Sequence, residues 1–559
     1  MKKCSVLCCI FLIIGILPAG VSFQDTLTDI PKFINVRTAS AEIWEQEYKL
    51  LALDNTTANN FGESVCIDGD TAIIGIPLDD DNGPGSGSAY IFTRSGTSWS
   101  LEQKLLPSDG STGKRFGQSV SIDGDTALIG AYHDYAGSVY VYTRTGTTWT
   151  QQAKLLASDG EVNEYFGVSV SLDGDTALIG AFWDDDNGDY SGSAYVFVRT
   201  DTTWSQQAKL LASDGVEDDQ FGVSVSLFGD SALIGSFAND AGSAYVFTRS
   251  GTTWTQQAKL LASDGELRDE FGITVSLDGD SALIGAWLDS DNGHWSGSAY
   301  VFTRSGTTWT QQAKLLASDG ETDDNFGVSV SLDGDRALVG SYWNNDYGVH
   351  SGSAYIFTRT GTMWTEQTKL LASDGVPGAL FGKAVSIQAD TALISVTYDA
   401  EKGCAYVFKK SDNQPPNADF SWMPQNPANN ESITFNASSS YDPNGTITSY
   451  EWDWDNNGVY DEAHSSPTAT HSWTSKGSYP VALRVTDDGN AQGTIIKTVN
   501  VSSINIIIDI NGGLGVKAVI TNNGTTPLST ITWQLQVIGG ILGKINKTIN
   551  GTVDIPSGS

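Results

Sequence analysis

The stretch Phe166-Gly-Val-Ser-Val-Ser-Leu172 alternates large and small side chains, and this two-residue period is typical of a β-strand. Asp173-Gly-Asp175 follows as a tight turn, and residues 176–181 are predicted to form a second strand. An acidic loop then leads to two further predicted strands, at residues 193–197 and 204–211. Four antiparallel strands in about 50 residues match the size of one blade of a β-propeller.

This unit recurs seven times along the chain. A Phe-Gly pair opens each unit, at Phe61, Phe116, Phe166, Phe221, Phe271, Phe326 and Phe381. A tryptophan precedes each of these phenylalanines by 17 positions, at Trp44, Trp99, Trp149, Trp204, Trp254, Trp309 and Trp364. Seven pairs at one spacing predict an all-β chain with a seven-bladed β-propeller over residues 43–410.

The ends of the repeat indicate how the ring closes. The last unit stops near residue 410 without a tryptophan strand, whereas an extra tryptophan strand stands at the front, at Trp44-Glu-Gln-Glu-Tyr-Lys-Leu-Leu51. We therefore expect the N-terminal strand to complete the last blade and to cover the strand edge that an open array would expose. An open solenoid is the alternative, but it gives no reason for the displaced strand.

The units resemble FG-GAP repeats, the family that forms the propeller of integrin α-chains. The match is carried by Phe166-Gly-Val-Ser-Val170 with Ile179-Gly-Ala181, and Ile74-Gly-Ile-Pro77 comes nearest to the family's Gly-Ala-Pro. Many integrin-type repeats carry a calcium loop between the first two strands. Here that connection shrinks to Asp173-Gly-Asp175, which offers too few oxygens for a calcium ion. The resemblance implies the fold but says little about function, because this fold hosts many activities.

In a propeller, the loops between the second and third strands share one face with the loops that join successive blades. We call this the loop face. Its second-to-third-strand loops contain residues 79–83, 184–188, 289–293 and 344–346, with shorter versions around His133 and Asn239. Acidic and aromatic residues gather there, which suits a surface for sugars, cationic segments or protein loops. The candidate ligand-binding residues are Trp183, Tyr190, Trp287, His294, Trp295, Trp343 and His350.

The same loops contain an Asp-x-Asp-Asn-Gly pattern, so calcium is a candidate ligand there. The candidate metal-binding residues are Asp79, Asp81, Asp184, Asp186, Asp289 and Asp291. The alternative is a set of hairpins with Asn-Gly turns and solvated acids. On the opposite face each blade carries one cation, at Arg94, Arg144, Arg199, Arg249, Arg304, Arg359 and, in the last blade, Lys409. We expect each to pair with an Asp of the Asp-Gly-Asp turn; a ring that binds anions is the alternative.

Residues 411–416 read as a linker, and residues 417–502 resemble a PKD domain, a small immunoglobulin-like β-sandwich. Tyr441-Asp-Pro-Asn-Gly445 and Tyr450-Glu-Trp-Asp-Trp454 carry this resemblance, which implies a spacer or adhesion module. Asp453, Asp455, Asn457 and Asp461 have the spacing of the first calcium-loop ligands, although His464 stands where the bidentate Glu is usual; a polar turn is the alternative. Residues 503–559 predict a further β-sandwich segment, short for a complete domain.

The N-terminus and the composition indicate an exported chain. Lys2 and Lys3 precede an apolar stretch, so residues 1–22 are predicted to be a signal peptide. The formal charge of −35 argues against nucleic acid as a partner. Cys66 and Cys404 remain after cleavage, and we favour two small buried residues over a disulfide. Eight Asn-x-Ser/Thr sequons predict glycosylation sites, at Asn55, Asn430, Asn436, Asn444, Asn500, Asn523, Asn546 and Asn550.

These features together predict a monomeric, secreted or cell-surface protein that binds an extracellular protein or glycan. A secreted enzyme that degrades polysaccharide or protein is the first alternative. The sequence contains no Gly-x-Ser-x-Gly and no His-Glu-x-x-His motif, and near-identical blades single out no catalytic set. A purely structural surface-layer component is the second alternative.

Overall fold

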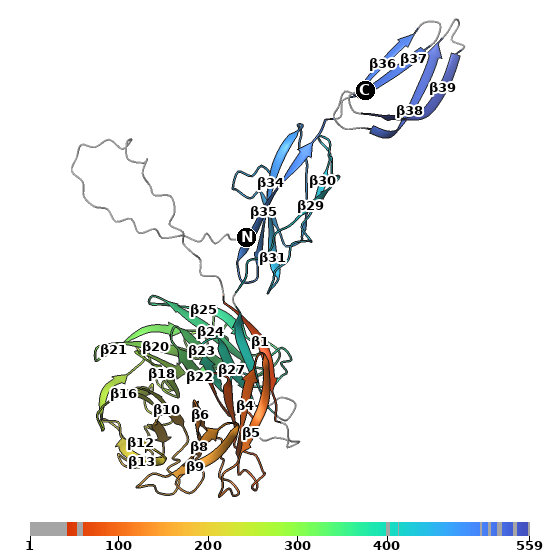
Figure 1. Ribbon diagram of the computed structural model, residues 1–559. Helices are drawn as coiled ribbons and strands as arrows, with labels where there is room; N and C mark the ends of the chain where they lie inside the picture. Colours follow the sequence, from red (N-terminus) through yellow and green to blue (C-terminus); the bar gives the residue numbers. More distant parts are fainter. Residues whose placement is uncertain are drawn as a thin grey trace, which may run out of the picture. The chain divides into compact units, whose positions relative to one another are not determined.

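The computed structural model describes residues 42–52, 60–397, 403–411, 413–503, 506–512, 516–522, 528–539 and 545–556. Every regular element in these ranges is a β-strand (Figure 1). The predicted signal peptide at residues 1–22 and the sequons at Asn55 and Asn523 lie outside the described residues. Within the described ranges, no helix is long and apolar enough to cross a membrane.

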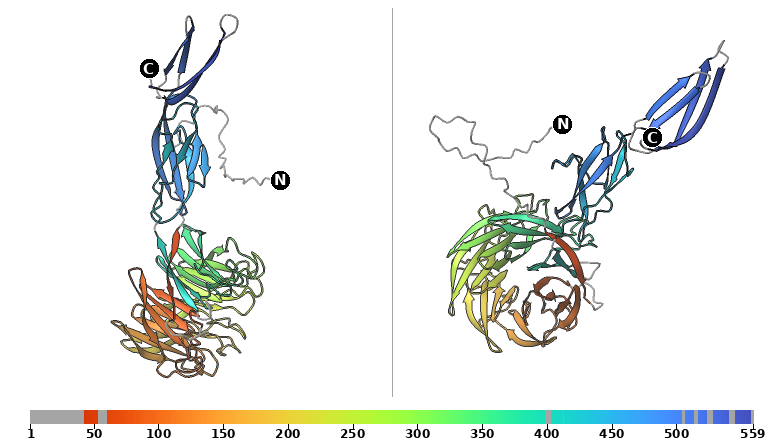
Figure 2. Two further views of the ribbon diagram at one scale, coloured as in Figure 1. Left: turned by 90° about the vertical axis from the view of Figure 1, so that its right-hand side faces the viewer. Right: turned by 45° about the horizontal axis from the view of Figure 1, so that its top comes forward.

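Seven four-stranded antiparallel sheets follow one another around a central channel (Figure 2). Blades one to three consist of β2 (Ser64–Asp68), β3 (Thr71–Ile76), β4 (Ser88–Ser95) and β5 (Ser98–Leu105); β6 (Val120–Asp123), β7 (Thr126–Ala131), β8 (Ser138–Thr145) and β9 (Thr148–Leu155); and β10 (Val170–Asp173), β11 (Thr176–Ala181), β12 (Ser193–Thr200) and β13 (Thr203–Leu210). Blades four to six consist of β14 (Val225–Phe228), β15 (Ser231–Ser236), β16 (Ser243–Ser250) and β17 (Thr253–Leu260); β18 (Thr274–Asp278), β19 (Ser281–Ala286), β20 (Ser298–Ser305) and β21 (Thr308–Leu315); and β22 (Phe326–Asp333), β23 (Arg336–Ser341), β24 (Ser353–Thr360) and β25 (Met363–Leu370).

The seventh blade joins the two ends of the repeat. It contains β26 (Val385–Gln388), β27 (Thr391–Val396), β28 (Cys404–Ser411) and, as its fourth strand, the N-terminal β1 (Ile43–Leu50). β1 runs antiparallel to β28, with Ile43 opposite Ser411 and Leu50 opposite Ala405. The predicted all-β fold with seven four-stranded units is confirmed.

The phenylalanine of each Phe-Gly pair lies at the centre of a blade core. In the third blade, the Phe166 side chain is fully buried, and its ring meets Tyr195 and Phe197 edge-on at 5.3 and 6.0 Å between centroids. The sequence predicted a strand from residue 166, but β10 begins only at Val170. Ahead of this strand, the Phe166 N–H donates to the Ala136 carbonyl of the preceding blade, at 2.9 Å.

Small residues let neighbouring blades approach closely. A Cβ atom on Gly180 would lie 1.9 Å from the carbonyl oxygen of Gly222 in the next blade, so no larger residue fits. The Ser169 hydroxyl donates to the same carbonyl oxygen at 2.9 Å. The last blade has different residues at these two positions. Ala384 stands where the other blades have the hydroxyl residue, and Ser395 stands where they have the glycine. The Ser395 hydroxyl accepts a hydrogen bond from the Ala384 N–H at 2.9 Å, so a hydroxyl is kept at this contact.

On the face opposite the loop face, the arginine at the equivalent position in each of the first six blades contacts three other side chains. Arg199 pairs with Asp175 of its own blade at 2.6 Å, donates to Thr126 of the preceding blade at 2.9 Å and lies over the Trp204 ring. The same pairing joins Arg94 with Asp70, Arg144 with Asp125, Arg249 with Asp230, Arg304 with Asp280 and Arg359 with Asp335. These six predicted Arg–Asp pairs are confirmed.

The seventh blade corrects one part of this prediction. Lys410, and not Lys409, stands at the position of the arginines, because Lys410 is the residue opposite Trp44. The Lys410 ammonium pairs with Glu42 at 2.9 Å, whereas Lys409 donates to the Thr391 hydroxyl at 3.3 Å. Successive side chains along a strand point to opposite faces of the sheet. A shift of one residue therefore moves the side chain to the other face.

The PKD-like region is a two-sheet sandwich. One sheet contains β29 (Ser421–Met423), β30 (Ile433–Asn436) and β33 (Thr468–His471); the other contains β31 (Ile447–Asp453), β32 (Glu462–His464), β34 (Gly477–Asp487) and β35 (Gln492–Val501). Trp452 is fully buried in the core between them and stacks on Trp454 at 5.2 Å.

The remaining strands form two antiparallel pairs, β36 (Ile506–Gly512) with β37 (Val516–Asn522) and β38 (Leu528–Gly539) with β39 (Ile545–Ile555).

No disulfide joins Cys66 and Cys404. The two cysteines lie on different strands, β2 and β28, and Cys404 is fully buried. Burial raises the pKa of the Cys66 thiol, which keeps it in the less reactive protonated form.

Candidate functional site

The acidic loops of the loop face are organised around lysines. The Lys209 ammonium, which comes from β13, lies 2.8 Å from Asp184, 2.7 Å from Asp186 and 2.9 Å from Asp159. The Tyr195 hydroxyl donates to Asp184 at 2.8 Å. Burial by itself would lower the pKa of Lys209, but the hydrogen bonds to these carboxylates outweigh it and raise that pKa above the usual range. A single ammonium group therefore pairs with three carboxylates, two from the loop between β11 and β12 and one from the connection that follows β9.

The other predicted calcium loops have the same arrangement. Lys104 pairs with Asp79 at 2.7 Å and Asp81 at 2.8 Å, and Lys314 pairs with Asp289 at 2.9 Å and also with Asp291. The structure thus brings each predicted pair of aspartates together, but around an ammonium group. A calcium ion between these carboxylates would have to displace the lysine.

The aromatic candidates are held at equivalent places on three loops. Tyr190, Trp295 and His350 all have positive φ angles, of 57°, 50° and 56°. Each backbone N–H donates to the side chain five residues earlier, on Asp185, Ser290 and Asn345 respectively. These bonds fix the backbone in a left-handed conformation that non-glycine residues seldom adopt. Tyr190 and Trp295 are exposed, so both present their rings to solvent.

An aromatic row joins the second and third blades. The His133 ring stacks on Tyr165 at 5.2 Å, Tyr165 lies 4.4 Å from Trp183, and Trp183 lies 5.0 Å from Tyr190. Tyr132 meets Tyr165 edge-on at 5.1 Å. We call the set of Tyr132, His133, Tyr165, Trp183 and Tyr190 the aromatic row. Sequence reasoning selected Trp183 and Tyr190 but missed Tyr165, whose signal was its place before Phe166, where the other blades carry no aromatic residue.

A second aromatic cluster joins the fifth and sixth blades. Trp287 stacks on Tyr342 at 6.1 Å, Tyr342 lies 5.4 Å from Trp343, and Trp343 stacks on His350 at 4.9 Å. The remaining candidates form a separate pair, His294 and Trp295, with ring centroids 4.2 Å apart. The seven predicted residues therefore form three groups and not one site.

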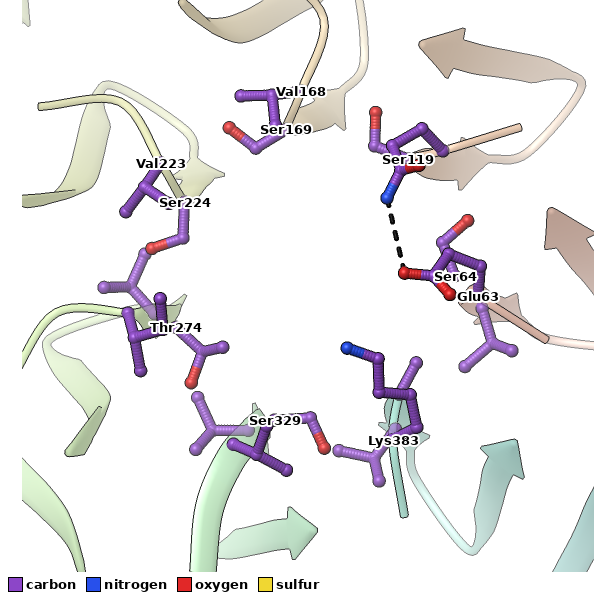
Figure 3. Close-up of a pocket in the computed structure, with 18 of the residues that line it drawn as sticks. Glu63, Ser64, Ser119, Val168, Ser169, Val223, Ser224, Thr274, Ser329 and Lys383 are labelled. Atoms are coloured by element: carbon purple, nitrogen blue, oxygen red, sulfur yellow. Dashed lines mark hydrogen bonds between the residues drawn. The ribbon is translucent and has the colours of Figure 1, made fainter. Parts of the chain in front are cut away.

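The mouth of the central channel opens into a cavity of about 470 Å³ (Figure 3). The residue after each Phe-Gly pair lines it: Glu63, Gln118, Val168, Val223, Ile273, Val328 and Lys383. Trp287 and Tyr342 also reach this lining, and a valine from every blade lies deeper in the channel. Sequence reasoning missed Glu63, Gln118 and Lys383, although they are the polar exceptions at a repeat position that is otherwise apolar.

In the PKD-like sandwich, the predicted calcium ligands come together after β31. Carboxylate oxygens of Asp453, Asp455 and Asp461 lie within 4.8 Å of one another. Asp453 is buried, which would raise its pKa, but hydrogen bonds from the N–H groups of Gly458 and Asn457 outweigh burial and lower it. Three carboxylates in this arrangement fit the chemistry of a divalent cation.

Comparison with known proteins identifies the domains. The FG-GAP repeat matches residues 44–92, 99–142, 149–197, 204–247, 254–302, 309–357 and 364–408, so the chain belongs to the FG-GAP repeat family. A PKD domain matches residues 413–502. Both domain types are typical of extracellular proteins, and together they fit an extracellular binding or adhesion module.

Individual relatives cover small parts of the chain. A microbial collagenase of Vibrio alginolyticus is 41% identical over 75 residues, which is 13% of this chain and 9% of the collagenase. The PKD1 domain of Vibrio anguillarum Epp is 32% identical, with a TM-score of 0.14, and the match covers 16% of this chain and 96% of that domain. A structure reported with carbohydrate-binding modules of the β-sandwich superfamily is 28% identical, with a TM-score of 0.16, over 25% of this chain and 54% of that one.

Proposed function

We propose that the chain is exported and acts at the cell surface or outside the cell as a binding or adhesion protein. The loop face of the propeller binds a glycan or a protein, and the PKD domain serves as a spacer. The observation that carries this proposal is the aromatic row, in which Tyr165, Trp183 and Tyr190 follow one another at 4.4 and 5.0 Å, beside His133 of the second blade. Successive aromatic rings at a surface offer stacking faces to sugar rings and apolar contact area to proteins.

In this proposal the chain binds its ligand and does not catalyse a reaction. The cavity lining, as far as the structure describes it, contains the single carboxylate Glu63, whereas most glycoside hydrolases use a pair of carboxylates. The lysine-paired loops support the same view, because their carboxylates are already engaged with Lys104, Lys209 and Lys314.

The experiment compares the whole chain with a double variant, Trp183→Ala with Tyr190→Ala, on a glycan array and on extracts of cell surfaces. We expect saturable binding by the unchanged chain and a loss of about tenfold or more in affinity in the variant, because each truncation removes a stacking partner. Tyr441→Ala, which removes an exposed aromatic side chain of the PKD domain, is the matched control and should bind normally.

The outcomes separate the alternatives. If the double variant binds saturably with unchanged affinity, the binding site lies outside the aromatic row. No saturable binding to any glycan or surface extract would contradict the proposal and favour a structural surface-layer component. Release of sugar or peptide products during the same incubations would instead favour an enzyme.

A further inference from the structure

At the repeat position after each Phe-Gly pair, the cavity has polar side chains on one side and apolar side chains on the other. The hydroxyl groups at the next position also line it, and each donates to a glycine carbonyl of the following blade, at Ser64, Ser119, Ser169, Ser224, Thr274 and Ser329. Lys383, Glu63 and Gln118 belong to the seventh, first and second blades, which are neighbours because the ring closes between blades seven and one. The four remaining blades, in ring order, place Val168, Val223, Ile273 and Val328 at the same repeat position. Figure 3 shows the Lys383 side chain extending into the cavity on the side of Glu63.

The fold does not require the charged residues at these places. Valine fills the equivalent position in three other blades, and all seven blades have the same four-stranded sheet. Within the described residues, no ion pair joins Lys383 to Glu63. The Lys383 ammonium lies 5.7 Å from the centre of the Tyr342 ring, and the Glu63 carboxylate accepts one long hydrogen bond, 3.4 Å, from Gln118. Both side chains line the cavity, and within the described residues neither has an ion-pair partner of opposite charge.

We propose that this cavity binds a small zwitterion with an apolar body, namely an apolar amino acid or a short apolar peptide with free termini. The ligand carboxylate pairs with the Lys383 ammonium. The ligand ammonium pairs with the Glu63 carboxylate, which Gln118 orients. The apolar side chains lie against Val168, Val223 and the deeper ring of valines. This site is separate from the aromatic row, and the proposal does not depend on the proposed function of the loop face.

The shape and chemistry of the cavity favour this ligand over simpler ones. Its volume of about 470 Å³ lies within the range usual for small-molecule sites. A simple anion would pair with Lys383 but would place a second negative charge beside Glu63. A simple cation would pair with Glu63 but would place a second positive charge beside Lys383. A sugar would provide hydroxyl groups for Glu63 and Gln118, but it would cover the valine wall with polar groups.

The experiment is isothermal titration of the whole chain with trileucine. N-acetylated and C-amidated trileucine, which carries neither terminal charge, and triglycine, which lacks the side chains, serve as comparison ligands. The variants Lys383→Val and Glu63→Val each install the residue that other blades carry at this position, so the propeller should keep its fold. Thermal unfolding checks this directly. Lys476→Val, at an exposed lysine of the PKD domain, is the control for the loss of one positive charge.

We expect one trileucine per chain. Binding should weaken about tenfold or more in Lys383→Val and in Glu63→Val, because each variant removes a charge-assisted hydrogen bond, and it should be unchanged in Lys476→Val. The blocked peptide and triglycine should both bind more weakly than trileucine. Three results would overturn the proposal: no saturable heat with trileucine, equal binding of the blocked peptide, or full affinity in a folded Lys383→Val variant.

Discussion

Lysine side chains give the acidic loops of the propeller their structure. Asp184 is 1% exposed at its side chain, and such a buried carboxylate is stable only with a close positive partner, which Lys209 provides at 2.8 Å. The same residue types at the same spacing recur around Lys104 and Lys314. The ammonium groups thus occupy the centres at which the sequence pattern alone suggested a metal ion.

Lys209→Gln tests this role. We expect the variant to lose about 3 kcal/mol of unfolding free energy, because it leaves the buried Asp184 carboxylate without a positive partner. Millimolar calcium should then raise the melting temperature of the variant more than that of the unchanged chain, since the ion can enter the vacated centre. Differential scanning calorimetry with calcium and with EDTA measures both effects, with the exposed Lys476→Gln as control. Equal calcium responses in the two proteins would contradict the prediction.

Glycine at the blade contacts is a second residue-scale requirement. In Gly180→Ala the new Cβ would lie 1.9 Å from the Gly222 carbonyl oxygen, so the blades must move apart. We expect a loss of about 3 kcal/mol or more in chemical denaturation. Gly146→Ala is the matched control: its φ is +65° with no atom within 4 Å of the new Cβ, so it should cost only about 1 kcal/mol. Similar losses in the two variants would count against close blade packing.

At the scale of elements, the N-terminal strand holds the ring closed. β1 is the fourth strand of the seventh blade, and its Trp44 ring belongs to the core of that blade. A chain that begins at Asn60 should therefore lose its single cooperative unfolding transition and should self-associate, because the edge of β28 is exposed. Light scattering and calorimetry measure both changes. A peptide of residues 42–52, added in excess, should restore the transition; a stable monomer without it would contradict this role of β1.

The calcium prediction for the PKD domain stays a prediction, with a test that separates binding from folding. Asp453 accepts backbone hydrogen bonds, so Asp453→Asn would destabilise the loop whether or not calcium binds. Asp455 is exposed and offers the cleaner change. If the three carboxylates bind calcium, titration of the whole chain should show a site that Asp455→Asn weakens about tenfold or more. The exposed Asp488→Asn serves as a charge-matched control. No calcium heat in the unchanged chain would reject the site.

At the scale of the whole molecule, the Lys–Asp pairs set a range of pH stability. Burial would raise the pKa of Asp159, Asp264 and Asp319, but their lysine partners outweigh burial and hold it below 3.8. The stabilisation by these carboxylates is present above pH 3.8 and is lost as the pH falls through the lowered values. The pKa of Lys209 is raised above 10.5, so its contribution is present below pH 10.5 and is lost only above it.

We therefore expect the melting temperature of the propeller to change little between about pH 5 and pH 10 and to fall on both sides of this range. Calorimetry across a pH series measures it. Lys209→Gln should lower the melting temperature throughout this range, and the difference from the unchanged chain should shrink above pH 10.5, where the lysine contribution ends. A steep loss of stability near neutral pH in the unchanged chain would show that other groups dominate.

The sequence by itself determined the fold class and the order of the domains. Seven copies of one spacing leave a single way to bury the Phe166-type side chains, and the displaced strand at Trp44 predicts how the ring closes. It also identified the arginine–aspartate pairs, because both partners recur in every copy from the first to the sixth. It misplaced the cation of the last blade at Lys409, since only the strand register shows that Lys410 faces Trp44.

Only the tertiary structure decided which side chains meet. Tyr165 is 18 residues from Trp183 in the sequence, and their contact depends on the pairing of β10 with β11 in the third blade. Lys383 and Glu63 stand at opposite ends of the repeat, and they line one cavity only because the ring closes. The lysines that engage the acidic loops lie on a separate strand, 25 residues beyond their aspartates in the case of Lys209 and Asp184. A repeat shows what its copies share, whereas a binding site arises where the copies differ, and only folding brings those differences together.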